Sequence, residues 1–169
     1  MLSMISAVKK TARRSINRLL FLRNGGKHGE NPRFNSRFRA NRKTIVGNNV
    51  HCNGITVIGS GEVVVGDNFH CGFGCIFITE NHKYRGADHI PYGKEYDVRS
   101  IRIAENVWLG INVTLLPGIS IGEGAIIQAG SVVVKDVESL SIVGGNPAKP
   151  FSQRDSEHYF QLKSEGKVF

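Results

Sequence analysis

Residues 101–137, IRIAENVWLGINVTLLPGISIGEGAIIQAGSVVVKDV, carry an apolar residue at every sixth position. The same spacing occurs upstream, with one extra residue between two groups of three. The twelve positions are Val46, Cys52, Ile58, Val65, Cys71, Phe77, Ile103, Leu109, Leu115, Ile121, Ile127 and Val133. In a chain that is 40% hydrophobic, chance would fill all twelve on the order of once in 10⁵ trials. The period of six therefore reflects the fold.

This period predicts an all-β fold, a parallel β-helix of triangular coils. Small or aliphatic residues recur four positions after the first column, and Gly followed by Asn, Asp or Glu marks tight turns between short strands. An antiparallel sandwich explains an alternation of apolar and polar residues, but it does not need a period of six. A triangular coil does need this period, because each of its sides places an apolar residue at the same inward position. We expect about four coils between Val46 and Val137, within a domain that spans residues 44–150.

Four segments after residue 102 carry motifs of a known family. They are Asn106–Gly110 (NVWLG), Leu115–Gly122 (LLPGISIG), Ala129–Asp136 (AGSVVVKD) and Gly145–Lys149 (GNPAK). Together they resemble the hexapeptide-repeat acyltransferases, in the branch that acetylates sugars and streptogramins. The resemblance implies a left-handed parallel β-helix, acetyl-CoA as co-substrate and a homotrimer whose active sites lie between adjacent subunits.

A polar segment, residues 78–102, interrupts the repeat and is predicted to be an active-site loop, because long loops on regular scaffolds commonly carry function. It contains Asn81 and His82, which resemble the Asn-His loop of the same acetyltransferases. The resemblance implies that His82 is the general base that removes the acceptor's hydroxyl proton, a task that imidazole performs near neutral pH. The alternatives are a solvated loop histidine at this position, or His89 as the base.

The resemblance also assigns a site for CoA. Backbone groups near Gly110, Ile111 and Ala129 would contact the pantetheine arm, and the amide of Ile111 would polarise the thioester carbonyl. The nucleotide end of CoA is anionic, and two basic residues, Lys135 and Lys149, occupy matching positions. Trp108 is expected either to line the cleft or to pack between subunits.

The acceptor site is less defined by the sequence. Asn53 lies where related sugar acetyltransferases place a substrate-binding Asn, although Cys52 is a rival match by one position. Within the loop, Asn81, Tyr84 and Arg85 are candidates for hydrogen bonds to a hydroxylated acceptor.

No metal site is expected. Three cysteines do not suggest a disulfide framework, and their place in the apolar columns predicts buried packing. His51 and His70 occupy the same point of successive coils, as a carbonic anhydrase of the related γ class would require, but the second pair of ligand histidines is missing at the expected spacing.

The net charge of +8 is concentrated at one end of the 169-residue chain. Residues 1–43, a predicted basic arm, contain 12 Lys and Arg and one acid, whereas the rest has net charge −3, which argues against a nucleic-acid partner. The arm carries an amphipathic helical stripe: Ile5, Val8, Ala12, Ile16 and Leu19. Such a helix predicts contact with an anionic membrane, docking on a neighbouring subunit, or a disordered arm.

Residues 151–169 are predicted to form a short capping helix, with Phe151, Tyr159 and Leu162 available to cover the end of the solenoid. We expect neither a transmembrane span nor a cleavable signal peptide, and hence a cytoplasmic protein, or one held peripherally at the inner face of the membrane.

These expectations converge on an acetyl-CoA-dependent O-acetyltransferase. Its acceptor would be a sugar, with building blocks of a surface polysaccharide or lipopolysaccharide preferred. The alternatives are N-acetylation of a nucleotide-linked amino sugar, acetylation of a streptogramin-type antibiotic, a non-enzymatic β-helix scaffold and a relative of the γ-class carbonic anhydrases.

Overall fold

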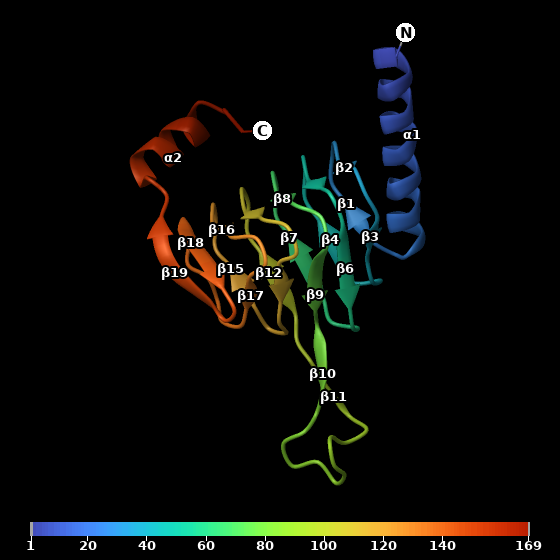
Figure 1. Cartoon of the computed structure of the whole chain (residues 1–169), viewed down its shortest axis with the longest axis vertical. Helices are drawn as coiled ribbons and strands as arrows, with labels where there is room; N and C mark the ends of the chain where they lie inside the picture. Colours follow the sequence, from blue (N-terminus) through green and yellow to red (C-terminus); the bar gives the residue numbers. More distant parts are fainter. Residues whose placement is uncertain (1, 169) are drawn as a thin grey trace.

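The structure, a computed structural model, describes residues 2–168, with side chains from residue 6 onward. Two helices flank a solenoid of short strands: α1 (Leu2–Arg23) and α2 (Ser156–Ser164). Successive strands of the solenoid belong to three different parallel sheets, so the chain winds around a common core (Figure 1). The predicted parallel β-helix is therefore confirmed.

Each sheet collects one side of the coils. The first sheet contains β1 (Lys27–His28), β4 (Thr44–Val46), β7 (Val63–Val65), β12 (Ile101–Ile103) and β15 (Ser120–Ile121). The second contains β2 (Arg33–Phe34), β5 (His51–Cys52), β8 (His70–Cys71), β13 (Trp108–Leu109), β16 (Ile126–Ile127), β18 (Ser141–Gly145) and β19 (Ala148–Gln153). The third contains β3 (Phe38–Arg39), β6 (Ile55–Ile58), β9 (Cys75–Ile78), β14 (Thr114–Leu115) and β17 (Val132–Val133).

The solenoid has five complete coils and a partial sixth, rather than the four expected. The first coil, formed by β1, β2 and β3, lies inside the segment assigned to the basic arm. Phe34 and Ala40 continue the period of six upstream of Val46, but the position before them is His28 rather than an apolar residue. Strands β1, β2 and β3 nevertheless pair in parallel with β4, β5 and β6. The sixth coil adds a single bridge from Val137 to Ile121 and then β18, on which β19 folds back antiparallel.

The apolar column forms the core, with one exception. Eleven of its twelve residues are buried, but Ile58 is 46% exposed. The inward place in β6 belongs to Val57, which pairs with the buried Phe77 of the next coil, so the expectation for Ile58 was wrong by one residue.

A column of asparagines stabilises one corner of the coils. Asn49, Asn68 and Asn106 adopt left-handed backbone angles (φ 54°, 54° and 59°), which Asn tolerates better than most residues. The Nδ2 of Asn49 donates to Asn68 (3.2 Å), and that of Asn68 donates to Asn106 (3.0 Å). At the end of this ladder, Asn106 donates to the hydroxyl of Tyr159 in α2 (2.9 Å), so the polar side chains support one another from coil to coil.

Helix α1 closes the first coil. Phe21 is fully buried, with its ring 4.8 Å from that of Phe34 and 5.0 Å from that of Phe38. One turn earlier, the buried Asn17 donates from Nδ2 to the carbonyl of Phe34 (3.0 Å). The opposite face carries the predicted apolar stripe, of which Val8, Ile16 and Leu19 are 64%, 58% and 66% exposed. The helix thus docks on its own solenoid through a face that the sequence stripe did not indicate.

The C-terminal end is closed differently from the expectation. No residue of α2 is buried, and Phe151 is 58% exposed. Strand β19 covers the outer edge of β18, while α2 is tied to the corner through Lys163, whose Nζ bonds Glu105 (2.9 Å) and Glu123 (2.6 Å). Within residues 2–168, neither helix is long and apolar enough to cross a membrane.

Replacing Phe21 with Ala should lower the free energy of unfolding by about 3–5 kcal/mol, because the change opens a cavity between three buried rings. Urea unfolding followed by circular dichroism measures this loss. Leu19→Ala, on the exposed face of the same helix, is the control and should change stability by less than about 0.5 kcal/mol. Equal losses in both variants would contradict the packing described for α1.

Acid should destabilise the fold through His51. Burial, and then the charges of His70, Arg33 and Arg14, lower its pKa from 6.5 to about 4. Because the folded pKa lies below the unfolded one, the unfolded chain binds more protons between these values, and stability falls as the pH drops through this window. Urea midpoints at about pH 7 and about pH 5 should therefore differ less in His51→Gln than in the parent. Identical pH dependence in both proteins would exclude this contribution.

Candidate functional site

One hairpin leaves the solenoid between the third and fourth coils. Strands β10 (Glu80–His82) and β11 (Tyr96–Val98) pair antiparallel, and the chain between them forms the projection seen below the coils in Figure 1. The predicted loop at residues 78–102 is thus anchored by a two-stranded stem. His82 sits at the outer end of this stem, directly opposite Tyr96.

Two tyrosine rings hold the His82 imidazole. Its centroid lies 3.8 Å from that of Tyr92, with the planes 14° apart, and 4.4 Å from that of Tyr96. The Nδ1 atom is buried and has no hydrogen-bond partner among the described residues. A buried imidazole nitrogen without a partner is costly, so its environment is incomplete in the single chain.

A hollow of about 720 Å³, here called the loop hollow, brings together several predicted residues. From the hairpin it is lined by Asn81, His82, Tyr84 and Arg85. The solenoid supplies the opposite wall: Leu116, Pro117 and Val134. Neutral apolar surface thus faces polar loop side chains around His82.

Two exposed ion pairs lie along the stem of the hairpin. Lys83 bonds Glu95 across the two arms (2.8 Å), and Arg99 bonds Asp97 within one arm (2.8 Å). The hydrogen bond from Arg99 lowers the pKa of Asp97, and the bond to Glu95 raises the pKa of Lys83. Asp97 and Lys83 therefore keep their charges near neutral pH.

A second hollow, of about 670 Å³, collects the predicted CoA-binding backbone and is called the corner hollow. It is lined by Trp108, Gly110, Ile111, Ala129 and Phe151, among others, and is mostly apolar. Successive coils approach closely here, because a Cβ on Gly110 would lie 2.5 Å from the backbone nitrogen of Ala129. The absence of a side chain on Gly110 lets the two coils approach this closely.

Three predicted residues lie outside both hollows. Lys135 and Lys149 are exposed and line neither. Asn53 donates to the carbonyl of Cys71 (2.8 Å) and accepts from Asn35 (3.0 Å), which ties neighbouring coils together. The structure therefore gives Asn53 a structural role and does not bring it near His82 within one chain.

The cysteines are core residues. Cys52, Cys71 and Cys75 are free and buried. A hydrogen bond with Cys52 raises the pKa of Cys71, and one with Cys71, together with burial, raises the pKa of Cys75. Thiols of this kind are poor nucleophiles, because the thiolate is disfavoured. Among the described residues, no group of three or more His, Cys, Asp or Glu side chains is placed to hold a metal ion.

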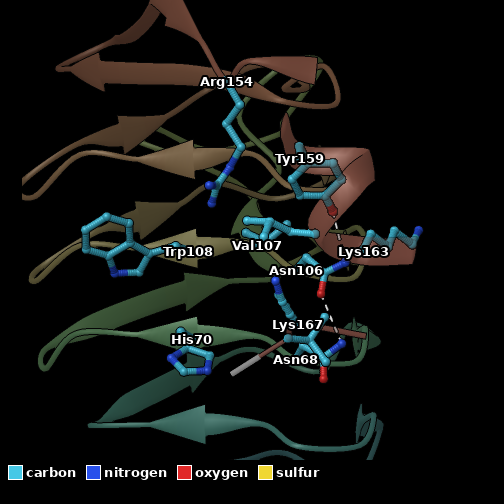
Figure 2. Close-up of a pocket in the computed structure, with 11 residues that line it drawn as sticks. Asn68, His70, Asn106, Val107, Trp108, Arg154, Tyr159, Lys163 and Lys167 are labelled. Carbon is cyan, nitrogen blue, oxygen red and sulfur yellow. Dashed lines mark hydrogen bonds between the residues drawn. The ribbon is translucent and has the colours of Figure 1, made fainter. Parts of the chain in front are cut away.

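A third hollow, of about 370 Å³, lies between α2 and the solenoid corner (Figure 2). Figure 2 shows Arg154 reaching between Trp108 and Tyr159, and its Nε donates to the carbonyl of Gly124 (2.6 Å). Apart from Trp108, none of its lining residues was predicted to bind substrate or cofactor, because the position of α2 is not encoded in the repeat. Trp108 also lines the corner hollow, so its indole borders both.

Residues 100–135 match the family model described as a bacterial transferase hexapeptide of six repeats. This match covers the coils that carry the corner hollow, and the observed sheets repeat in the same register. Over these residues the chain is similar to the hexapeptide-repeat transferases.

The curated relatives that this chain resembles include acetyltransferases. A chloramphenicol acetyltransferase of Escherichia coli is 34% identical over 117 residues, which is 60% of this chain and 56% of that protein. The chain thus spans little more than half the length of this relative.

Solved structures agree with the fold. A hexapeptide-repeat acetyltransferase of Vibrio cholerae, crystallised with acetyl coenzyme A, is 26% identical with a TM-score of 0.58, covering 86% of this chain and 78% of the other. A maltose O-acetyltransferase of Clostridium difficile is also 26% identical, with a TM-score of 0.59, covering 85% and 75%.

Sequence reasoning missed the tyrosines around His82. Tyr92 and Tyr96 follow it by 10 and 14 residues, and only the hairpin brings their rings together. Their aromatic character within a polar loop was the available signal.

Replacing Tyr92 with Leu should move the ring-proton resonances of His82 downfield, because a ring stacked at 3.8 Å shields them. Nuclear magnetic resonance of histidine-labelled protein measures this change, with His82→Gln to assign the signal. Tyr84→Leu, at an exposed position of the same loop, is the control and should leave the resonance in place. An unchanged His82 signal in Tyr92→Leu would show that the stack does not exist in solution.

Proposed function

We propose that this chain is an acetyl-CoA-dependent acetyltransferase that transfers the acetyl group to a hydroxyl of a sugar. The observation that carries the proposal is the presence of two complementary hollows in a solenoid similar to the hexapeptide-repeat transferases: one surrounds an imidazole, and the other is apolar and lies where two coils approach closely. Acetyltransferase relatives, among them a maltose O-acetyltransferase, support the reaction class and the acceptor.

The loop hollow suits the acceptor. His82 would accept the proton of the attacking hydroxyl while its oxygen bonds to the thioester carbonyl carbon. The carbon–sulfur bond then breaks, and the proton passes to the departing thiolate of CoA. Asn81, Tyr84 and Arg85 provide donors for the remaining hydroxyls of a sugar, and the wall of Leu116, Pro117 and Val134 suits the apolar face of its ring.

The corner hollow suits the donor. Pantetheine is an extended arm with amides, and the backbone at Gly110, Ile111 and Ala129 offers it a narrow apolar channel. The amide of Ile111 is proposed to polarise the thioester carbonyl. Lys135 and Lys149 are exposed cations, and we propose that they meet the anionic nucleotide end of CoA outside the corner hollow.

A complete site requires a second subunit. The loop hollow and the corner hollow share no lining residue, and the Nδ1 of His82 lacks a partner within the described chain. We therefore propose a homotrimer in which the loop hollow of one subunit faces the corner hollow of the next. We further propose that the enzyme is cytoplasmic and contacts the membrane peripherally through α1.

A second acceptor class is favoured by one observation. The 34% identity to a chloramphenicol acetyltransferase makes a hydroxyl of an antibiotic the main rival to a sugar. Release of free thiol from acetyl-CoA, measured across sugars, amino sugars, chloramphenicol and a streptogramin, separates these acceptors and also detects N-acetylation. No thiol release with any of them would remove the acetyltransferase proposal.

Replacing His82 with Ala should lower turnover about 10²–10⁴-fold, because the hydroxyl proton loses its acceptor. Ala129→Trp is the corresponding substitution in the proposed CoA site. Ala129 is exposed, and an indole at this position fills the corner hollow. After mixing and subunit exchange, some interfaces in mixed trimers carry neither change, so activity should reappear.

The fold of both variants is checked by circular dichroism, and exchange by mass spectrometry of tagged subunits. Full activity of folded His82→Ala would exclude this base. No recovery despite proven exchange would exclude a site shared between subunits while leaving the reaction itself open to the thiol-release assay.

A further inference from the structure

The outward face of α1 is apolar and has no partner among the residues of its own chain that the structure describes. Val8, Ile16 and Leu19 lie on the side opposite Phe21, the residue that anchors the helix to the solenoid. Each is more than half exposed. An apolar helix face of this size usually has a binding partner, because contact with water is unfavourable.

The same helix is strongly basic. It contains six Lys and Arg residues and no Asp or Glu. Lys9 and Arg13 lie beside the apolar stripe and Arg23 continues it, so a surface that meets the stripe also meets their charge. Arg14 and Arg18 face the first coil instead, where they donate to Asn35 (2.7 Å) and His28 (2.9 Å). Long basic side chains can extend to a charged surface while their methylene groups remain in contact with apolar groups.

A basic hollow continues this surface where α1 ends. Arg23, Arg37, Arg39 and Arg42 line a depression of about 710 Å³, together with Asn24, Ala40 and Asn41. Arg23 follows Ile16 by seven residues and Leu19 by four, so it extends the stripe side of the helix toward the hollow. Within residues 2–168, none of the four arginines forms an ion pair with an acidic side chain.

Four arginines gathered without an acid repel one another, and an anion relieves that repulsion. Guanidinium groups match the geometry of phosphate oxygens through paired hydrogen bonds. The hollow therefore suits a phosphate group, and its position beside an apolar helix face suits a phosphate attached to acyl chains.

We propose that the outward face of α1 and the four-arginine hollow bind the surface of an anionic phospholipid bilayer. The apolar side chains of the stripe enter the boundary between headgroups and acyl chains, and the arginines hold lipid phosphates. The opposite face of α1 stays packed on the first coil through Phe21 and Asn17, so binding needs no unfolding of the solenoid.

This arrangement deepens the membrane contact included in the proposed function. Figure 1 shows α1 at one end of the solenoid, with the β10–β11 hairpin projecting from its middle. A bilayer bound by α1 would thus lie beside the end of the coils rather than over the hairpin. A lipid-linked sugar could then be held at the membrane surface while its polar part extends to the loop hollow.

Two rival occupants fit less well. Nucleic acid would use the arginines but leaves the apolar stripe without a partner. A second copy of this chain would cover the stripe but brings no excess of acid to the arginine hollow, since the chain outside residues 1–43 has net charge of only −3. The combination of apolar stripe and arginine cluster favours a lipid surface.

Sedimentation with vesicles tests the proposal on the full chain. Vesicles of phosphatidylcholine and phosphatidylglycerol should carry the protein into the pellet at low salt, and vesicles of phosphatidylcholine alone should bind it far more weakly. Raising the salt concentration should weaken binding, because counterions screen the arginines. Free inorganic phosphate at the same ionic strength should compete no better than chloride, which distinguishes a lipid surface from a site for soluble phosphate.

Paired variants separate the two parts of the surface. The double substitution Arg37→Gln with Arg39→Gln should weaken vesicle binding about 30-fold. Each basic residue near an anionic membrane surface contributes about five-fold to the binding constant. Lys94→Gln with Lys167→Gln removes the same charge at exposed positions elsewhere and should leave binding within about two-fold. Ile16→Gln with Leu19→Gln should abolish sedimentation at low salt with the circular dichroism spectrum unchanged.

Several results would overturn the proposal. The protein would fail to sediment with anionic vesicles at low salt, or it would bind neutral vesicles equally well. Alternatively, the Lys94 and Lys167 control would lose as much vesicle binding as the Arg37 and Arg39 variant. A drop in oligomer mass of the Ile16 and Leu19 variant, without vesicle binding by the parent, would assign the stripe to a second copy. Thiol release with a soluble acceptor is measured in parallel, so failure of vesicle binding is distinguishable from failure of the acetyltransferase proposal.

Discussion

Stacking of one inward residue upon the next, coil after coil, holds this molecule together. In the second sheet the column runs through Phe34, Cys52, Cys71, Leu109 and Ile127, each paired in register with its neighbours and each buried. No single coil can bury such a residue, because its upper and lower faces remain open to water. Stability therefore depends on neighbours, and both ends of the stack require a cover.

The two covers differ in chemistry, and that difference shapes the surface. At the start, α1 places Phe21 over the first coil and leaves its other apolar face in solvent. At the end, β19 pairs with β18, and α2 is tied through Tyr159 and Lys163 to the polar corner. Helix α1, which packs through an apolar residue, leaves an amphipathic and basic surface at the start of the solenoid. Helix α2, which is held by polar contacts, encloses a small hollow beside Trp108.

The features proposed to act in function lie where the repeat is interrupted or narrowed. The β10–β11 hairpin can leave the stack without disturbing it, since the coils before and after it still pair in parallel, β7 with β12 and β9 with β14. It carries His82 between two tyrosine rings, while at Gly110 the missing side chain lets two coils approach closely. A regular scaffold of this kind fixes the distance between such features across coils, which a flexible loop pair would not do.

The sequence by itself determined the architecture and pointed to the candidate site residues. The period of six predicted the parallel β-helix because inward positions recur by geometry, and a break in that period predicted the loop that carries His82. The first coil escaped prediction because its apolar column is incomplete: His28 stands where an apolar residue was expected, and Phe21 of α1 packs on this coil.

Only the tertiary structure decided what contacts what. It showed that Ile58 points outward, because Val57 takes the place opposite Phe77. It showed that Asn53 braces neighbouring coils, and that Tyr92 and Tyr96 stack on His82 across the hairpin. The sequence predicted the apolar stripe of α1 but not whether the stripe faces the solenoid or the solvent. Amphipathicity shows which residues share a face of a helix, and not which face contacts the rest of the protein.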